Sequence, residues 1–172
     1  SLFLVSFGCN KVDDQPEDPI VETPVKDPEE PTDAPEIVIK PIDKVDVENL
    51  TVLDEYSFDF DNDGEEETIA MYTVAQRDSK GEIIWDDGQN WIFVVHDTDK
   101  DYVLIDEYVQ LGSIDFNIFT IEEEFYIAAY SARTASLSLK LFQYDSENDT
   151  FKLTVPYNTD GNVNMLKSSY GY

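Results

Sequence analysis

Short stretches in which apolar and polar side chains alternate occupy the chain from about residue 50 onward. In LDEYSFDF, for example, Tyr56, Phe58 and Phe60 alternate with polar residues, a period of two that puts one set of side chains on each face of a β-strand. Similar stretches, rich in the β-branched and aromatic residues that strands favour, are ETIAMYTVAQ, NWIFVVHDT, DYVLIDEYVQ, SIDFNIFTI, EEFYIAAYS, ASLSLKLFQYD and DTFKLTVPYN. No stretch has the period of a long amphipathic helix.

Turn-forming residues separate these stretches, as in RDSKGE, DDGQN, DTDKD, LGS and YDSENDT. Residues 49–172 are therefore predicted to form an all-β domain, an antiparallel meander of about eight to ten strands. Two arrangements remain open at this point, a sandwich or propeller-blade-like sheets.

The segment before this domain, residues 10–48, has a different composition. It holds seven of the eight prolines and many acidic residues, and it has no glycine or aromatic residue. Such a segment cannot bury enough apolar surface to offset the entropy lost on ordering, and its prolines and like charges keep it extended. We predict a disordered, semi-rigid linker that spaces the domain from an attachment point, with a tail of no particular role as the alternative.

The chain begins with an apolar run, SLFLVSFGCN, in which the only cysteine is Cys9. We interpret residues 1–9 as the remnant of a secretory signal, too short to span a bilayer. The pair Gly8–Cys9 after apolar residues resembles a bacterial lipoprotein signal, and the resemblance implies lipidation of Cys9, although Ser6 and Phe7 depart from the usual pattern. The alternatives are an ordinary cleaved signal and a chance apolar end with a free thiol.

The net charge narrows the range of partners. The 172 residues include 11 Lys and Arg against 38 Asp and Glu, a formal charge of −27. So acidic a chain is unsuited to nucleic acid or to an anionic membrane surface, and it favours cations. We expect a monomer that meets a membrane only through a lipid on Cys9.

Acidic residues are densest in FDFDNDGEEETIAMYT, residues 58–73. Counted from Asp59, aspartates stand at positions 1, 3 and 5, a glycine at position 6, and glutamates at positions 7 and 9. Calcium takes about six to eight oxygen ligands, and alternate positions of a tight loop can turn oxygens inward around the turn that Gly64 permits. The pattern predicts a calcium site made by Asp59, Asp61, Asp63, Glu65 and Glu67, with Glu65 contributing its backbone carbonyl and Glu66 left in solvent. Magnesium fits less well, because it keeps its waters.

The calcium loop of helix–loop–helix proteins needs an acid at position 12, which is Ala70 here. The acidic stretch instead resembles the D-x-D-x-D-G-x-x-E loop of FG-GAP/VCBS-type repeats, which joins two strands in integrin-like propellers and bacterial surface proteins. Only one such loop is present, so the whole chain resembles a small lipoprotein of Gram-positive bacteria with a single loop of this kind. The turns DTDKD and DSEND lack the glycine, and we interpret DTDKD as a hairpin turn.

Three other residues are candidates for a functional role, and for each of them a structural role is weighed as well. His96, the only histidine, has no second histidine or thiol near it in sequence and is expected to be a hydrogen-bonded residue at a strand end. Trp85 and Trp91 flank DDGQN and are either core residues or part of a surface for a glycan, a peptide or a cell-wall ligand.

No catalytic motif is recognisable in the sequence, and with so many acids a carboxylate pair carries no information. We therefore expect a non-enzymatic, extracytoplasmic calcium-binding surface lipoprotein. The alternative is a secreted, carbohydrate-active hydrolase or an accessory domain of one.

Overall fold

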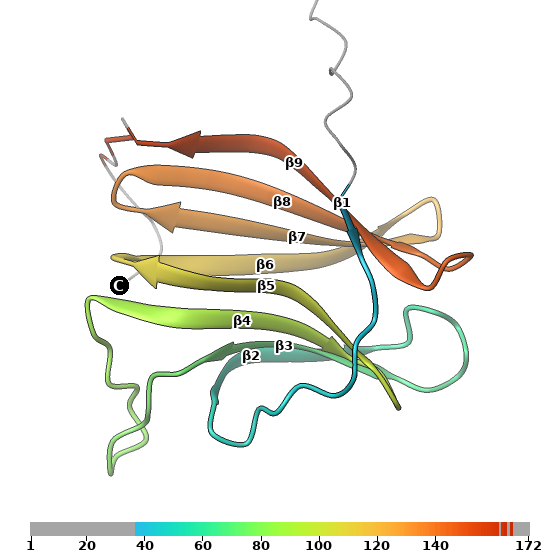
Figure 1. The fold of residues 1–172 in the computed structure, drawn as a ribbon, viewed down its shortest axis with the longest axis horizontal. Coiled ribbons are helices and arrows are strands. Elements are labelled where there is room, and N and C mark those ends of the chain that lie inside the picture. The colour runs from blue at the N-terminus through green and yellow to red at the C-terminus, as the bar shows by residue number, and fades with distance from the viewer. Residues whose placement is uncertain (1–36, 162, 165, 167–172) are drawn as a thin grey trace, which may run out of the picture. The chain divides into compact units, whose positions relative to one another are not determined.

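The computed structural model describes residues 37–161, 163–164 and 166, and in this part of the chain it contains strands and no helix (Figure 1). The strands are β1 (Ile37–Ile39), β2 (Thr51–Phe58), β3 (Glu67–Thr73), β4 (Gly88–His96), β5 (Asp101–Gln110), β6 (Gly112–Ile121), β7 (Glu124–Arg133), β8 (Ser136–Asp145) and β9 (Thr150–Asp160). A search of the same residues finds no helix with the length and apolar character to cross a membrane.

The strands form two antiparallel sheets. Strands β2 to β5 follow one another in a four-stranded meander, and β6 to β9 do the same in the second sheet, where β1 adds a fifth strand beside β9. The predicted all-β meander is confirmed, with nine strands in the described residues. The eight stretches of alternating sequence correspond to β2 through β9.

One hydrophobic core lies between the two sheets. Its fully buried members come from both: Phe93 and Tyr102 belong to the four-stranded sheet, and Ile127, Phe142 and Phe151 belong to the five-stranded sheet. Burial of each such side chain stabilises the fold by about 1.5–3 kcal/mol. Two sheets that share one core are a sandwich, the first of the two arrangements that the sequence left open.

The segment before β2 covers the outer face of the four-stranded sheet. Ala70, Tyr72 and Val94 are buried on that face, and Val45, Val47 and Leu50 are among the residues packed against them. Strand β3 is consequently buried on both faces, which explains why TIAMYT reads as a continuous apolar run.

Residues 37–48 therefore differ from the disordered linker that composition predicts for 10–48. Strand β1 pairs with β9, and Ile42 forms a bridge with Asp101. The physical reason is local: Ile37, Val38 and Ile39 are a β-branched apolar triplet whose signal is lost when composition is averaged over the whole segment. The rest of the predicted linker, residues 10–36, and the predicted signal with Cys9 lie outside the described residues.

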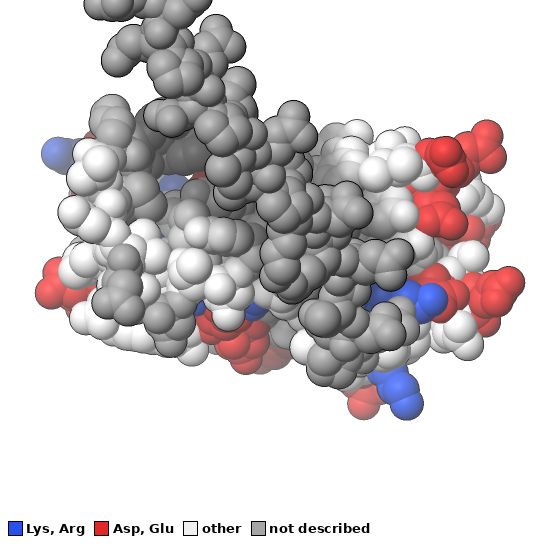
Figure 2. Space-filling view, turned by 90° about the horizontal axis from the view of Figure 1, so that it is seen from above, with Lys and Arg blue, Asp and Glu red and all other residues white. Residues whose placement is uncertain are grey.

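The links between strands fall at two ends of the domain. The links that follow β2, β4, β6 and β8 lie at the right in Figure 1, and those that follow β3, β5 and β7 lie at the left. Acidic side chains gather at the right-hand end of the face in Figure 2. Lys100 is the only basic residue in the four right-hand links, 59–66, 97–100, 122–123 and 146–149. This end of the domain is therefore suited to a cation.

Candidate metal centre

The acidic loop, residues 59–66, joins β2 to β3 directly after the last register pair of the two strands, Phe58 with Glu67. Phe60 anchors the loop in the core: its side chain is 5% exposed, and its ring centroid lies 5.2 Å from that of Phe125 and 4.6 Å from that of Tyr144. The period of two that makes β2 a strand thus continues into the loop and places an apolar side chain between two aspartates. The packing of Phe60 therefore positions the loop against the core.

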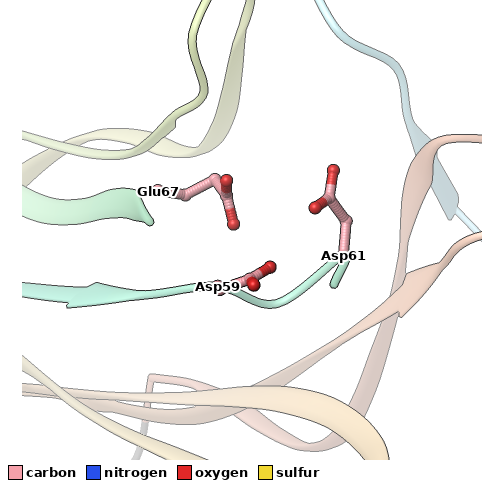
Figure 3. A group of neighbouring side chains, drawn as sticks. All are labelled: Asp59, Asp61 and Glu67. Carbon is pink, nitrogen blue, oxygen red and sulfur yellow. The ribbon is translucent and has the colours of Figure 1, made fainter. Parts of the chain in front are cut away.

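Three carboxylates converge at this loop. Asp59 and Asp61 lie in the loop, and Glu67 is the first residue of β3. One oxygen from each lies within 4.8 Å of the others, and the three side chains point toward one another (Figure 3). Glu67 is only 1% exposed. Of the predicted calcium ligands, the structure brings these three side chains together.

Backbone amides of the loop hold its aspartates in place. The amide of Gly64 donates to Asp59 Oδ2 (3.2 Å), that of Asp63 to Asp61 Oδ1 (3.1 Å), and that of Glu65 to Asp63 Oδ1 (2.8 Å). The tight path needs positive φ at Asn62 (63°) and Gly64 (95°), a region that asparagine and glycine enter most readily. The loop therefore presents fixed acceptor oxygens.

One oxygen of this group has no hydrogen-bond donor. Asp59 Oδ1 is buried, and within the described part of the chain no donor reaches it. Leaving a buried acceptor unsatisfied costs about 1–3 kcal/mol, and more for a charged group. A cation between Asp59, Asp61 and Glu67 would satisfy this oxygen, so the residues present fit a metal ion.

Burial and crowding disfavour the charged forms of two of these acids. Burial raises the pKa of Glu67 to about 7, assisted by the charges of Asp61, Asp97 and Asp59 and opposed by the hydrogen bond that the Phe60 amide donates (3.0 Å). Burial likewise raises the pKa of Asp61, with further increases from the neighbouring aspartates. A bound cation would reverse both effects, because it favours the ionised carboxylates.

Asp97 is a fourth acid near the centre. DTDKD forms the predicted hairpin turn between β4 and β5, and nothing in its spacing indicates that Asp97 lies near the acidic loop. Its negative charge contributes to the raised pKa values of both Asp61 and Glu67, and its side chain is 8% exposed. The register explains its position: β3 pairs with β4 up to Thr68 opposite His96, so the next residue along, Asp97, comes beside Glu67. Only knowledge of this pairing could have found it.

The β4–β5 link also contributes a positively charged side chain, Lys100, which forms ion pairs with two nearby aspartates. Lys100 Nζ lies 3.3 Å from Asp97 Oδ2 and 2.6 Å from Asp149 Oδ2. Burial acts to raise the pKa of Asp149, but hydrogen bonds from Lys100, Tyr102 and Tyr144 outweigh it and lower the pKa. The ammonium group of Lys100 thus forms ion pairs with both Asp97 and Asp149.

The remaining predicted residues lie around the three carboxylates. Asp63 is exposed and outside the converging group, and Glu66 is exposed, as expected. The side chain of Glu65 accepts a hydrogen bond from the Thr98 hydroxyl (2.7 Å), which ties the acidic loop to the β4–β5 link. The assignment of Asp63 and the Glu65 carbonyl as ligands stays a prediction.

His96 has a structural role. Its Nδ1 lies 2.9 Å from Asp101 Oδ1, and its Nε2 lies 2.8 Å from the Tyr72 hydroxyl. Both ring nitrogens have partners at the end of β4, in agreement with the expectation of a hydrogen-bonded residue at a strand end.

Comparison of the chain with protein-family models, curated proteins and solved structures finds no match. The geometry of the acidic loop is therefore the main support for a functional proposal.

Proposed function

We propose that this protein binds one calcium ion at the acidic loop and that the ion is structural. The observation that carries the proposal is the buried, unpartnered Oδ1 of Asp59, a residue whose carboxylate converges with those of Asp61 and Glu67. A structural ion here fastens the β2–β3 link and relieves the repulsion among its acids. Asp63 and the carbonyl of Glu65 complete the proposed ligand set.

Calcium is favoured over magnesium by the shape of the ligand set. Calcium accepts many oxygens at varied angles, whereas magnesium requires near-octahedral geometry and retains several waters. A loop that offers carboxylates and a carbonyl within a few residues matches the first description. Sites of this kind in extracellular modules bind calcium with dissociation constants on the order of 10⁻⁴–10⁻³ M.

Calcium addition is expected to stabilise the protein by a free energy that grows with the logarithm of free calcium above the dissociation constant. With free calcium at about 100 times the dissociation constant, the gain is about 2.7 kcal/mol. Calorimetric titration and melting curves with calcium or with a chelator measure binding and stabilisation separately. The control is Asp99→Asn, because Asp99 is an exposed acid of the neighbouring link that is absent from the converging group. A protein that gives neither heat nor a melting shift at about 10 mM calcium, roughly ten times the weakest dissociation constant expected, would rule the site out.

We further propose that the domain is an extracytoplasmic, non-enzymatic module anchored through a lipid on Cys9, with residues 10–36 as the spacer. The supports are the Gly8–Cys9 pair after an apolar run and the proline-rich, acidic composition of the segment that follows. The calcium proposal fits this location, because free calcium is millimolar only outside the cytoplasm.

Lipid attachment is tested by labelling. Exported in bacteria with a complete signal sequence, the protein should incorporate an alkyne-tagged fatty acid and sediment with membranes. Cys9→Ser should abolish the label and release the protein, since Cys9 is the only thiol in the chain. Label that persists in the variant, or a wild-type protein that never carries it, would contradict anchoring at Cys9.

A further inference from the structure

A cavity of about 510 Å³ lies where the β3–β4 link meets the crossover from β5 to β6, at the end of the domain opposite the acidic loop (Figure 1). Two tryptophans form its aromatic wall. The rings of Trp85 and Trp91 are nearly parallel, with centroids 5.8 Å apart and an angle of 17° between the planes. Trp91 is buried in the core, whereas Trp85 is 52% exposed. A large indole surface is thus held in the solvent-facing part of a cavity.

The opposite wall is fixed by the crossover itself. Leu111 is the single residue between β5 and β6, and its amide donates to the carbonyl of Asp87 (2.9 Å). Gly112 lies so close to the neighbouring strand that an added Cβ would come within 2.2 Å of the Ala132 carbonyl oxygen. The hydrogen bond joins the β3–β4 link to the crossover, and the close approach of Gly112 holds the crossover against β7, so both sides of the cavity are fixed by the fold.

All charged side chains that line the cavity are negative. Asp86 and Asp87 line it together with the neutral Gln89 and Ser113, and none of its lining residues is Lys, Arg or His. The Ser113 hydroxyl is engaged with Asp115 Oδ2 (3.2 Å). The cavity therefore combines an aromatic face with a negative field, which is the complement of an organic cation.

We propose that this cavity binds a small quaternary ammonium compound, with its N-methyl groups on the exposed face of Trp85 and its charge balanced by Asp86 and Asp87. Tryptophan is the ring that attracts cations most strongly. A methylated ammonium is weakly hydrated and loses little on leaving water, whereas a primary ammonium is compact and strongly hydrated. A neutral sugar would gain nothing from the carboxylate charges beyond hydrogen bonds.

This site is independent of the proposed calcium site. Hard metal ions require converging oxygen ligands, and Asp86 and Asp87 do not belong to the converging carboxylate group found in the described residues. A variant can therefore lose binding of the ammonium compound while it retains binding of calcium, and the reverse.

The test is titration of the full-length protein, in saturating calcium, with choline and with its neutral isostere, in which a tert-butyl group replaces the trimethylammonium. Tryptophan fluorescence and calorimetry follow binding. Choline should bind at least about tenfold more tightly than the isostere, and its affinity should fall as salt is added. Equal affinity for the two compounds, or binding of chitin oligosaccharides but not of choline, would overturn the proposal.

Two variants localise the binding. Trp85→Ala should weaken choline binding about tenfold or more, and the double change Asp86→Asn with Asp87→Asn should weaken it and remove most of the salt dependence. The matched control is Asp106→Asn, because Asp106 is an exposed acid on β5 that does not line the cavity. A cooperative melting transition close to that of the wild type, measured without choline, shows that each variant is folded. Choline affinity that survives Trp85→Ala would show that the cation binds elsewhere.

Discussion

Glu67→Gln is expected to stabilise the calcium-free protein at about pH 8 and to abolish most of the stabilisation that calcium provides. The carboxylate is almost fully buried, and its pKa rises from 4.5 to about 7, so ionising it in the folded state costs about 3 kcal/mol. Glutamine has nearly the same shape, carries no charge and can still accept the hydrogen bond from the Phe60 amide. The same change removes a charged metal ligand, so its effect should reverse sign when calcium is added.

The pH dependence separates this explanation from a simple packing effect. Below pH 4.5 Glu67 is protonated in both the folded and the unfolded protein, and it contributes no pH dependence. Between 4.5 and about 7 the unfolded protein has lost this proton and the folded protein retains it, so stability falls as pH rises and levels off above about 7. Calcium-free Glu67→Gln should lack this decline, which urea unfolding at a series of pH values measures.

Glu66→Gln is the matched control. Glu66 is adjacent in sequence but exposed, so its substitution should leave stability nearly unchanged with or without calcium. A calcium-induced shift of wild-type size in Glu67→Gln would exclude Glu67 as a ligand. Equal loss in both glutamine variants would instead point to general electrostatic attraction.

Phe60→Ala is expected to be the most destabilising single change in the acidic loop, by about 3–5 kcal/mol. The Phe60 ring contacts those of Phe125, Tyr144 and Phe151, so its removal leaves a cavity in the core. It also releases the loop between Asp59 and Asp61 from its anchor. Calcium affinity should fall as well, since binding must then order the loop.

Phe119→Ala serves as the control for loss of an aromatic ring. Phe119 is half-buried and stacks on Tyr126 in β7, away from the core contacts of Phe60. Its removal should cost less and should leave calcium affinity unchanged. Denaturant unfolding in the presence of a chelator measures the free energy of unfolding of each variant, and calorimetry measures its affinity for calcium. If Phe60→Ala destabilises the protein but binds calcium like the wild type, the loop does not depend on the core for its conformation.

Local pattern was sufficient for most of the fold. A period of two, together with β-branched and aromatic residues, identified the stretches that form β2 to β9. Strand β3 is the exception to the alternation, because it is buried on both faces. Strand β1 was missed because Ile37–Ile39 is only three residues long and is surrounded by proline and acid. Its pairing with β9 joins segments that lie far apart in sequence.

The two candidate sites likewise combine residues that are close in sequence with residues that only the fold brings together. Asp59, Asp61 and Glu67 lie within nine consecutive residues, so the sequence could predict that they form a group. Asp97 joins them only through the register of β3 with β4, and Trp85 reaches Trp91 only through the path of the β3–β4 link. Neither contact can be derived from local composition, although the sequence marks both tryptophans as candidates for a binding surface.

The segment 37–50 determines which fragment of this chain stays monodisperse. A fragment that begins at residue 49 lacks β1, so the backbone groups of β9 that β1 occupies become a free edge, open to pairing with a second copy. It also lacks Val45 and Val47, which uncovers part of the apolar face formed by Ala70, Tyr72 and Val94. Self-association is the expected result, so the practical boundary of the domain lies before Ile37, inside sequence that composition alone assigns to the linker.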